Sequence, residues 1–404
     1  MSTMTICDDK SCTGCMACVG ICPVDAIGIS SDERGFYCPV IQENACIHCN
    51  RCRRICPSLN PSHGNQVVWT VACWQPDQAL RLDSTSGGAF TALADYVFAQ
   101  GGTVFGAAFS DDLRVEHVEI FSREDMWRLR GSKYVQSYMG TVYRTVEQRL
   151  RDNRYVLFSG TPCQVAGLKA FLGKTYDRLL TVDIICHGVP SPLFFADYLE
   201  HIRQEYSPLI NRINFRYKKP SWTKFSMKIE FADREPYLSD KFTDPYLIAF
   251  LYDYISQDCC HHCPYTSTVR QGDITLADFW GYVSQKYKYR NDEKGISLVL
   301  VNSKAGLNVF EQVSPRLICV DKKIEEAISG NRCLSSPYPQ NKNTEAFWRE
   351  YLGEKNGYDA VKARYLYKRK AGIKHDISVA VDNFSWLIPH AIRSMYDRFK
   401  GKIK

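Results

Sequence analysis

Two copies of one cysteine spacing constrain this chain more than any other feature of its sequence. In residues 12–23 and again in residues 46–57, four cysteines are separated by two, two and three residues, and a proline follows the last one. Thiolates at this spacing bind a pair of 4Fe-4S clusters: the first three of each run hold one cluster, and the fourth crosses to the other. The N-terminal part of the chain is therefore predicted to be a small electron-transfer module.

The spacing assigns the eight cysteines to two ligand sets. One cluster would be held by Cys12, Cys15, Cys18 and Cys56. The other would be held by Cys46, Cys49, Cys52 and Cys22. The alternative is a pair of zinc sites, in which two Cys-x2-Cys knuckles hold each ion. The third cysteine of each run, the Cys-Pro ending and the duplication favour a two-cluster 4Fe-4S ferredoxin domain.

The length and composition of the chain predict a larger folded domain after this module. The chain has 404 residues, far more than a two-cluster module needs, and its 45% hydrophobic and 13% aromatic residues exclude a disordered protein. No apolar run is long enough to span a bilayer, and the N-terminus lacks the basic and apolar regions of a secretion signal. Because cluster-type cysteines and spare thiols suit a reducing compartment, we expect a cytoplasmic protein.

The order of patterned segments predicts an α+β protein. Residues 57–65 are rich in Pro, Ser, Asn and Gly and read as a linker after a bacterial-type ferredoxin domain at residues 1–62. Helical patterns at residues 88–98 and 164–172 alternate with β-like runs in the segment that follows. The β-like runs are residues 103–109, 115–120, 155–158, 212–216, 224–231, 274–277 and 297–301. Residues 63–340 are therefore predicted to form a mixed α/β domain, and residues 341–404 a helical C-terminal extension.

The C-terminal extension is also basic. The formal net charge of +7 is concentrated there, because residues 362–374 contain six Lys or Arg and no acid, and five more cations follow in residues 393–404. We interpret this as a solvated helical face. The alternatives are a docking surface for an acidic electron carrier or weak peripheral contact with anionic lipid. No known nucleic-acid-binding motif accompanies these basic residues, so nucleic acid is not an expected partner.

Two Gly-containing loops precede helical patterns in the second domain. The segment Ser84-Thr85-Ser86-Gly87-Gly88 is of a kind that binds anions at a helix N-terminus, although such a loop is more commonly a simple N-cap. The segment Gly160-Thr161-Pro162-Cys163 would place Cys163 in the first helical turn, where the helix dipole favours a thiolate. Between them lies Lys133, which could stabilise an anionic reduced flavin or could be an ordinary surface lysine.

Four further cysteines could supply a third site: Cys163, Cys186, Cys260 and Cys263. Cys259 is an alternative to Cys260, and the neighbouring His261 and His262 keep a zinc site possible. The remaining cysteines fit no ligand spacing and are expected to be buried apolar residues or free thiols. They are Cys7, Cys38, Cys73, Cys319 and Cys333.

Together these residues resemble the beta subunits of coenzyme F420-reducing hydrogenases and dehydrogenases, a family that uses a deazaflavin hydride carrier. The resemblance covers roughly residues 67–335 and follows the family's order of motifs. The motifs are Ser84-Thr85-Ser86-Gly87-Gly88, Gly131-Ser132-Lys133-Tyr134-Val135-Gln136, Ser159-Gly160-Thr161-Pro162-Cys163-Gln164, Cys186-His187-Gly188-Val189-Pro190, Cys260-x2-Cys263 and Gly272-Asp273-Ile274-Thr275-Leu276-Ala277-Asp278-Phe279-Trp280-Gly281.

The resemblance implies that residues 63–340 bind FAD and that Cys163, Cys186, Cys260 and Cys263 hold a third 4Fe-4S cluster. The residues implied to line the FAD are Ser86, Gly87, Gly88, Lys133, Tyr134, Gln136, Thr161 and Gln164. Lys133 would lie near the flavin N1/C2 carbonyl and support hydride transfer. A fused N-terminal ferredoxin is a familiar arrangement in this family.

The expected function is that of an FAD- and iron–sulfur-dependent oxidoreductase. It would pass electrons between 4Fe-4S clusters and FAD, coupled to a hydride-carrying substrate such as a deazaflavin or another reducible small molecule. Its partners would be an electron carrier or redox partner subunit and a small-molecule hydride donor or acceptor. The alternatives are an electron-relay subunit of a larger redox complex and a reductase in surface-polysaccharide synthesis.

Overall fold

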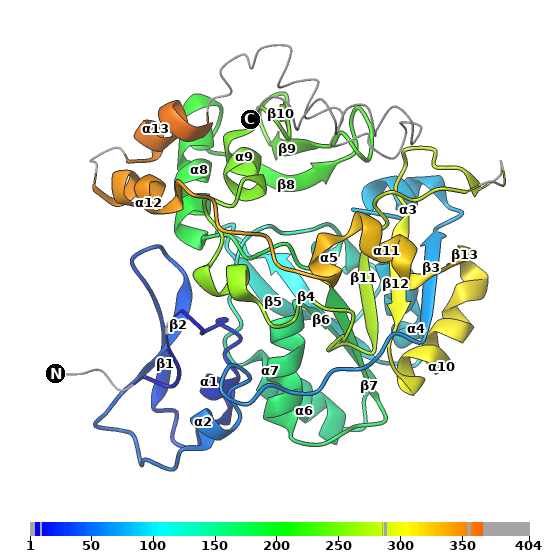
Figure 1. The fold of residues 1–404 in the computed structure, drawn as a ribbon, viewed down its shortest axis with the longest axis horizontal. Helices are drawn as coiled ribbons and strands as arrows, with labels where there is room; N and C mark the ends of the chain where they lie inside the picture. The colour runs from blue at the N-terminus through cyan, green and yellow to red at the C-terminus, as the bar shows by residue number, and fades with distance from the viewer. Residues whose placement is uncertain (1–4, 9, 285, 287–288, 354–356, 367–404) are drawn as a thin grey trace, which may run out of the picture.

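A mixed eight-stranded sheet forms the centre of the molecule (Figure 1). The computed structural model describes residues 5–8, 10–284, 286, 289–353 and 357–366. The strand order is β13-β3-β12-β11-β7-β6-β4-β5. The strands are β3 (Trp69–Trp74), β4 (Thr103–Phe109), β5 (Val115–Ile120), β6 (Val156–Gly160), β7 (Leu179–Ile184), β11 (Ile274–Asp278), β12 (Ser297–Val301) and β13 (Ile318–Lys322).

Both faces of this sheet are covered by helices, because its central strands carry apolar side chains on both faces. In β12, Val299 and Val301 pack toward one face, while Leu298 and Leu300 pack toward the other. The first face is covered by α4 (Ala89–Ala99) and α10 (Lys304–Val313), with α5 (Met126–Leu129) near β4. On the opposite face, α6 (Val142–Arg151) and α7 (Pro162–Leu172) cover β4 and β6, and α11 (Ile324–Gly330) covers the β3–β13 edge. The result is a three-layer arrangement of helix, sheet and helix.

A second, aromatic-rich core lies beyond one edge of the sheet layer. Its three-stranded antiparallel sheet consists of β8 (Ile210–Tyr217), β9 (Ser226–Phe231) and β10 (Tyr237–Asp240). This sheet packs with α8 (Pro192–Glu205) and α9 (Pro245–Leu251), and with α12 (Thr344–Gly353) and α13 (Gly357–Val361) from the end of the described chain (Figure 1). Since α8 directly follows β7 and its loop, this core lies close to the ends of the central strands.

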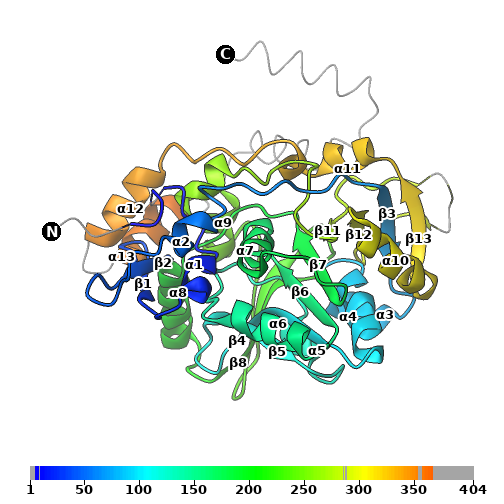
Figure 2. The same cartoon turned by 90° about the horizontal axis from the view of Figure 1, so that it is seen from below.

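The N-terminal segment packs directly on the central domain. It consists of α1 (Ala17–Ile21), the hairpin β1 (Ile27–Ser31) and β2 (Tyr37–Ile41), and α2 (Arg51–Arg54). Helix α1 lies against α6 and α7, and the views in Figure 1 and Figure 2 both show this contact. The Arg144 guanidinium on α6 donates to the carbonyl oxygens of Gly20 and Cys22, at 2.7 and 3.0 Å. These contacts fix the position of the cysteine-rich segment on the larger domain.

The connection at residues 57–65 is anchored to the central domain. The Asn65 N–H donates to the carbonyl of Arg270 at 2.7 Å, and the Arg270 N–H donates back at 2.8 Å. A Cβ atom at Gly64 would lie 2.7 Å from the same carbonyl oxygen, so only glycine allows this close approach. The Ser62 hydroxyl donates to the side chain of Gln271. The segment therefore connects the two parts of the protein without acting as a free tether.

The expected helices and strands of the central domain are confirmed, with small shifts at their ends. The strand at residues 103–109 is found at the expected bounds, and the expected helix at residues 88–98 is α4. Within the expected helical extension at residues 341–404, the structure describes α12, α13 and a π-helical turn at Lys362–Leu366. Residues 367–404 lie outside the described residues, so the extension as a whole stays a prediction. Among the helices that the structure describes, none combines the length and hydropathy that a bilayer crossing requires.

The remaining elements are short. They are α3 (Gln78–Asp83) and the 3-10 helices η1 (Asp258–His262), η3 (Ser314–Arg316) and η4 (Arg332–Leu334).

Candidate functional site

The sequence motifs gather at one edge of the central sheet. Strands β4, β6, β7 and β11 pair in parallel, and β3 runs the same way because it is antiparallel to β12, which is antiparallel to β11. Residues 84–88, 161–163, 186–188 and 279–281 follow the carboxyl ends of β3, β6, β7 and β11. Ligands of open α/β sheets bind outside the carboxyl ends of such strands. The topology therefore brings together residues that are far apart in the sequence.

Four thiols lie close together at this edge. Cys163 is in the first turn of α7, Cys186 follows β7, Cys260 is in η1, and Cys263 follows η1 directly. Burial raises the pKa of the Cys163 thiol, and the neighbouring thiols of Cys263, Cys186 and Cys260 raise it further. The pKa of Cys186 is also raised by burial and by Cys260 and Cys263. The structure thus gathers the four cysteines that the sequence grouped together.

The arrangement distinguishes Cys260 from Cys259. Cys260 is the residue of this pair that interacts with Cys163 and Cys186, whereas the Cys259 thiol forms a hydrogen bond with that of Cys260. Cys333 in η4 also interacts with Cys186 and Cys263, although it was expected to be unrelated to any site. No His, Cys, Asp or Glu group of three or more within the described residues is arranged to hold a single metal ion. Four thiolates suit a cubane, in which each binds a different iron atom.

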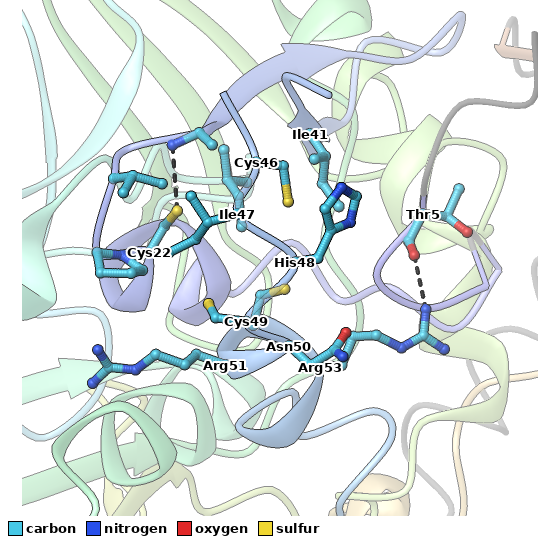
Figure 3. Close-up of a pocket in the computed structure, with 15 residues that line it drawn as sticks. Thr5, Cys22, Ile41, Cys46, Ile47, His48, Cys49, Asn50, Arg51 and Arg53 are labelled. Atoms are coloured by element: carbon cyan, nitrogen blue, oxygen red, sulfur yellow. Dashed lines mark hydrogen bonds between the residues drawn. The ribbon is translucent and has the colours of Figure 1, made fainter. Parts of the chain in front are cut away.

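The N-terminal cysteines form two further groups. A cavity of about 250 Å³ is lined by Cys22, Cys46, Cys49 and Cys52. Figure 3 shows Cys22, Cys46 and Cys49 around one space, with Ile41 and Ile47 beside it. A smaller cavity, of about 20 Å³, is lined by Cys12, Cys15, Cys18 and Cys56. Each cavity contains one of the two expected ligand sets, and the thiols of the smaller one would have to spread to surround a cluster.

Cys7 is a component of the smaller cavity that spacing alone did not identify. Its side chain is 9% exposed and lines that cavity. The Cys7 thiol hydrogen-bonds to Cys56 and lowers the pKa of Cys56 to about 6. A single cysteine five residues before the first run gives no spacing signal, so only the fold reveals this contact.

The smaller N-terminal cavity lies against the helix that carries Cys163. A Cβ atom at Gly167 would be 3.1 Å from the Cys15 Sγ atom and 3.0 Å from the Tyr143 hydroxyl. Gly167 is four residues after Cys163, so the two positions are about 6 Å apart along α7. Burial and then the thiols of Cys15 and Cys163 raise the pKa of Tyr143, which places this ring beside both groups. We call Cys12, Cys15, Cys18 and Cys56 the Cys15 group, and Cys163, Cys186, Cys260 and Cys263 the Cys163 group. Helix α7 therefore connects the Cys15 group to the Cys163 group.

The loop at residues 84–88 is closely packed. The Gly87 N–H donates to the Ser297 hydroxyl at 2.9 Å, and a Cβ atom at Gly87 would lie 2.3 Å from the Cys73 carbonyl oxygen. Gly88 has φ +89° and caps α4, so glycine is also favoured there. The Ser86 hydroxyl donates to the Ile296 carbonyl at 2.6 Å. Local packing accounts for these glycines whether or not a ligand approaches the loop.

Buried cations lie beside this loop. The Arg216 Nη1 atom donates to Asp278 Oδ2 at 3.0 Å and to the Tyr134 hydroxyl at 3.2 Å. Its Nε and Nη2 atoms are buried and have no hydrogen-bond partner among the described residues. Burial lowers the pKa of Lys133 and of Lys218 to about 7 in each case. Arg216 thus has unused donors, and Lys133 and Lys218 are buried cations. Such an environment is one that an anionic ligand would stabilise.

Several expected flavin contacts have protein partners. The Lys133 Nζ atom donates to the carbonyl oxygens of Arg128 and Arg130, at 2.8 and 3.1 Å. The Gln136 side chain, 4% exposed, accepts from the Tyr37 N–H at 2.7 Å, so it joins the central domain to β2. The Gln164 Oε1 atom accepts from the Thr161 N–H at 2.9 Å, which closes the first turn of α7.

One buried histidine was not anticipated. The His117 Nε2 atom lies 3.0 Å from the Ser159 carbonyl oxygen and therefore carries the proton, while Nδ1 accepts from the Ser137 hydroxyl at 2.7 Å. Burial lowers the pKa of His117 to about 4, so the ring is neutral at pH 7. The Gln164 Nε2 atom donates to the same hydroxyl at 3.0 Å. This network links the segments around Lys133 and Cys163.

The motif at residues 272–281 is mainly structural. The Asp273 carboxylate accepts from the Thr181 N–H and hydroxyl, at 2.9 and 2.6 Å, and so joins β11 to β7. The next buried acid, Asp183, is 0% exposed and lies 3.3 Å from the Arg270 guanidinium. The Asp273 contacts fix the start of β11 against β7, and the Asp183–Arg270 pair lies near the end of β7, shortly before Cys186.

Comparison with known proteins identifies the two parts of the chain. Residues 11–60 match the 4Fe-4S dicluster domain family, and residues 153–326 match the family described as the C terminus of the coenzyme F420 hydrogenase/dehydrogenase beta subunit. A subunit of the F(420)H(2) dehydrogenase of Methanosarcina mazei is 22% identical over 334 residues, which is 79% of this chain and 90% of that protein. An uncharacterized protein of Methanocaldococcus jannaschii is 22% identical over 347 residues, 76% of this chain and 87% of that protein.

A solved structure of the F420-reducing NiFe hydrogenase complex from Methanosarcina barkeri is also similar. It has 18% sequence identity and a TM-score of 0.46, with 72% of this chain and 95% of that chain covered. The two family matches, supported by the curated relatives, establish what the chain contains. This protein is an iron–sulfur redox protein whose residues 11–60 match a 4Fe-4S dicluster domain and whose residues 153–326 are related to the C-terminal part of coenzyme F420 hydrogenase/dehydrogenase beta subunits.

Proposed function

We propose that this protein is a flavin- and iron–sulfur-dependent oxidoreductase. Electrons would pass singly through the dicluster domain to the Cys163 group and then to FAD at the carboxyl edge of the sheet. The observation that carries this proposal is the series of three thiol groups. The Cys49 group, which consists of Cys22, Cys46, Cys49 and Cys52, lies at the surface. The Cys15 group lies against α7, and the Cys163 group lies at the start of the same helix.

The proposed ligands follow from this arrangement. Cys12, Cys15, Cys18 and Cys56 would hold one cluster of the dicluster domain, and Cys22, Cys46, Cys49 and Cys52 the other. Cys163, Cys186, Cys260 and Cys263 would hold the third. Cys259 is left out because Cys260, and not Cys259, interacts with Cys163 and Cys186.

The proposed FAD site is the cationic region beside residues 84–88. The chemistry that bound FAD supplies is the conversion of single electrons into a hydride, which no side chain can perform. The two unused donors of Arg216 support an anionic ligand there, because a buried guanidinium normally has all of its N–H groups paired. Lys133 would supply positive charge, held in position by the carbonyl oxygens of Arg128 and Arg130. Tyr134, whose ring lies 4.6 Å from that of Phe250, would contribute apolar cover.

The hydride-carrying substrate is proposed to be a deazaflavin or another reducible small molecule. The name of the Methanosarcina mazei relative supports a deazaflavin, since that protein belongs to a dehydrogenase of reduced F420. The same name supports a second candidate function, because one component of such a complex can relay electrons to a catalytic partner without a substrate of its own. The dicluster domain would then exchange electrons with partner subunits.

Anaerobic stopped-flow spectroscopy tests the proposal. Protein reconstituted with iron, sulfide and FAD is mixed with reduced F420, and the flavin and cluster absorbances are followed separately. Substrate-dependent bleaching of the flavin followed by the clusters supports the oxidoreductase. Intact clusters without bound FAD would overturn it and favour the relay. The Arg216→Leu variant should bind FAD more weakly while its iron content is unchanged, which separates loss of the flavin site from loss of the clusters.

A further inference from the structure

We propose that the surface around α2 and Cys49 is the docking site for an acidic one-electron carrier protein. This inference rests on the proposed function and names the partner of its outermost cluster. The first observation is position. Cys49 is exposed, whereas Cys15 and Cys18 are buried against the central domain. Because electron tunnelling weakens steeply with distance, a carrier must approach the exposed cysteine group.

The second observation is charge. Residues 44–60 contain Arg51, Arg53 and Arg54 and no acidic residue. Glu43 lies just before this stretch. All three arginines are exposed, and within the described part of the chain none of them forms an ion pair. Figure 3 shows Arg51 and Arg53 extending to opposite sides of the Cys49 loop. A positive rim around an exposed cluster site attracts a negatively charged partner and accelerates its encounter.

The third observation is the apolar surface inside this rim. Ile47 is 59% exposed, and Val24 is 42% exposed. Both line the same cavity as Cys22, Cys46, Cys49 and Cys52. An apolar centre with a charged rim has the composition of a transient interface: the rim sets the rate and orientation of docking, and the centre excludes water. Redox encounters of this kind need little buried area.

The test is the rate of electron transfer from a reduced, acidic bacterial-type ferredoxin to the oxidised holoprotein. The second-order rate constant is measured anaerobically by stopped flow over a range of about 0.05 to 0.5 M salt. The expected rate constant falls as salt rises. The Arg51→Glu/Arg53→Glu/Arg54→Glu variant should be slower by about tenfold or more at low salt and should lose the salt dependence, because steering raises association rates by about 10- to 1,000-fold.

A matched control separates local charge from net charge. The Arg154→Glu/Arg178→Glu/Arg349→Glu variant makes the same charge change at three exposed arginines elsewhere on the molecule. It should retain at least half of the wild-type rate. Equal slowing in both variants, or a wild-type rate that does not depend on salt, would overturn the docking site.

Arg53 and Arg54 donate to the carbonyl oxygens of Thr5 and Cys49, so the triple variant could lose a cluster. The single variant Arg51→Glu breaks no such bond, and it should still slow the reaction by about threefold. An unchanged rate in this variant, with a full iron content, would also overturn the proposal. Reduction of the same samples by dithionite shows whether the clusters and FAD are present, so failure of docking is distinguishable from failure of the proposed function.

Discussion

The Gln136→Met substitution should loosen the contact between the dicluster domain and the central domain. The Gln136 Oε1 atom accepts the Tyr37 N–H of β2 at 2.7 Å, and its Nε2 atom lies 3.4 Å from the Tyr37 carbonyl oxygen. Methionine has a similar volume and no strong acceptor. The Tyr37 N–H would lose its partner, which costs about 1–3 kcal/mol for a buried donor. The 3.4 Å contact between Gln136 Nε2 and the Tyr37 carbonyl oxygen is too long to add much to this free-energy cost.

Hydrogen exchange measures this cost directly. If β2 opens locally, a loss of about 1–3 kcal/mol should accelerate exchange of the Tyr37 amide by roughly 5- to 150-fold. Mass spectrometry of peptides covering residues 36–41 in the anaerobic holoprotein gives the rate. Cleavage by proteases within residues 57–65 should increase in parallel.

The matched control is Gln148→Met, which removes an exposed amide that bonds to Asp152 within α6. It should leave exchange at residues 36–41 unchanged. FAD content should also be unchanged in the Gln136 variant, because both polar atoms of the amide face Tyr37. Unaltered exchange in that variant, or a loss of FAD without faster exchange, would refute this reasoning.

Three further substitutions test other parts of the account. Gly167→Leu should displace Cys15 by steric contact and lower the iron content, measured by chemical assay, by about four atoms per chain. The control Gly353→Leu, at a position with no atom within contact distance of the added Cβ, should leave the iron content unchanged. Lys133→Met should retain FAD and lower its reduction potential in spectroelectrochemical titration; an unchanged potential would remove Lys133 from the flavin site. Burial raises the pKa of Asp244 to about 6 from 3.8, so its ionised form destabilises the fold as pH rises through this window. Asp244→Asn should therefore raise the free energy of unfolding at pH 7.5, measured by urea denaturation, by up to about 3 kcal/mol. The gain should be smaller toward pH 5. An equal gain at both pH values would contradict the raised pKa of Asp244.

The sequence predicted those parts of the fold whose signal is local. Short β-like runs identified β4, β5 and β12, and the Gly-Thr-Pro-Cys turn correctly placed Cys163 at the start of a helix. The cysteine spacing grouped residues that line two cavities in the structure. These patterns are readable because a β-like run and a ligand spacing both depend on near neighbours in the chain.

Features that depend on distant segments could not be read in this way. Gln136 and Tyr37 are 99 residues apart in the sequence, and nothing local indicates that one amide bonds to the other. Cys7 and Cys333 are isolated in the sequence, yet the fold brings each beside other thiols. The composition of residues 57–65 indicated a linker, but nothing local showed that the backbone pairing of Asn65 with Arg270 anchors it. Arg216 had no motif to mark it, because its importance lies in burial and in unused donors.

The cofactor content of the anaerobically purified protein distinguishes an oxidoreductase with three clusters and FAD from an electron relay. Iron, acid-labile sulfide and flavin are quantified per chain, together with the visible spectrum. We expect about twelve iron atoms, about twelve sulfides and about one FAD per chain. About eight iron atoms with FAD would remove the third cluster and return Cys163, Cys186, Cys260 and Cys263 to another role. Protein that contains clusters but binds no FAD, even after reconstitution, would contradict the oxidoreductase and leave an electron relay.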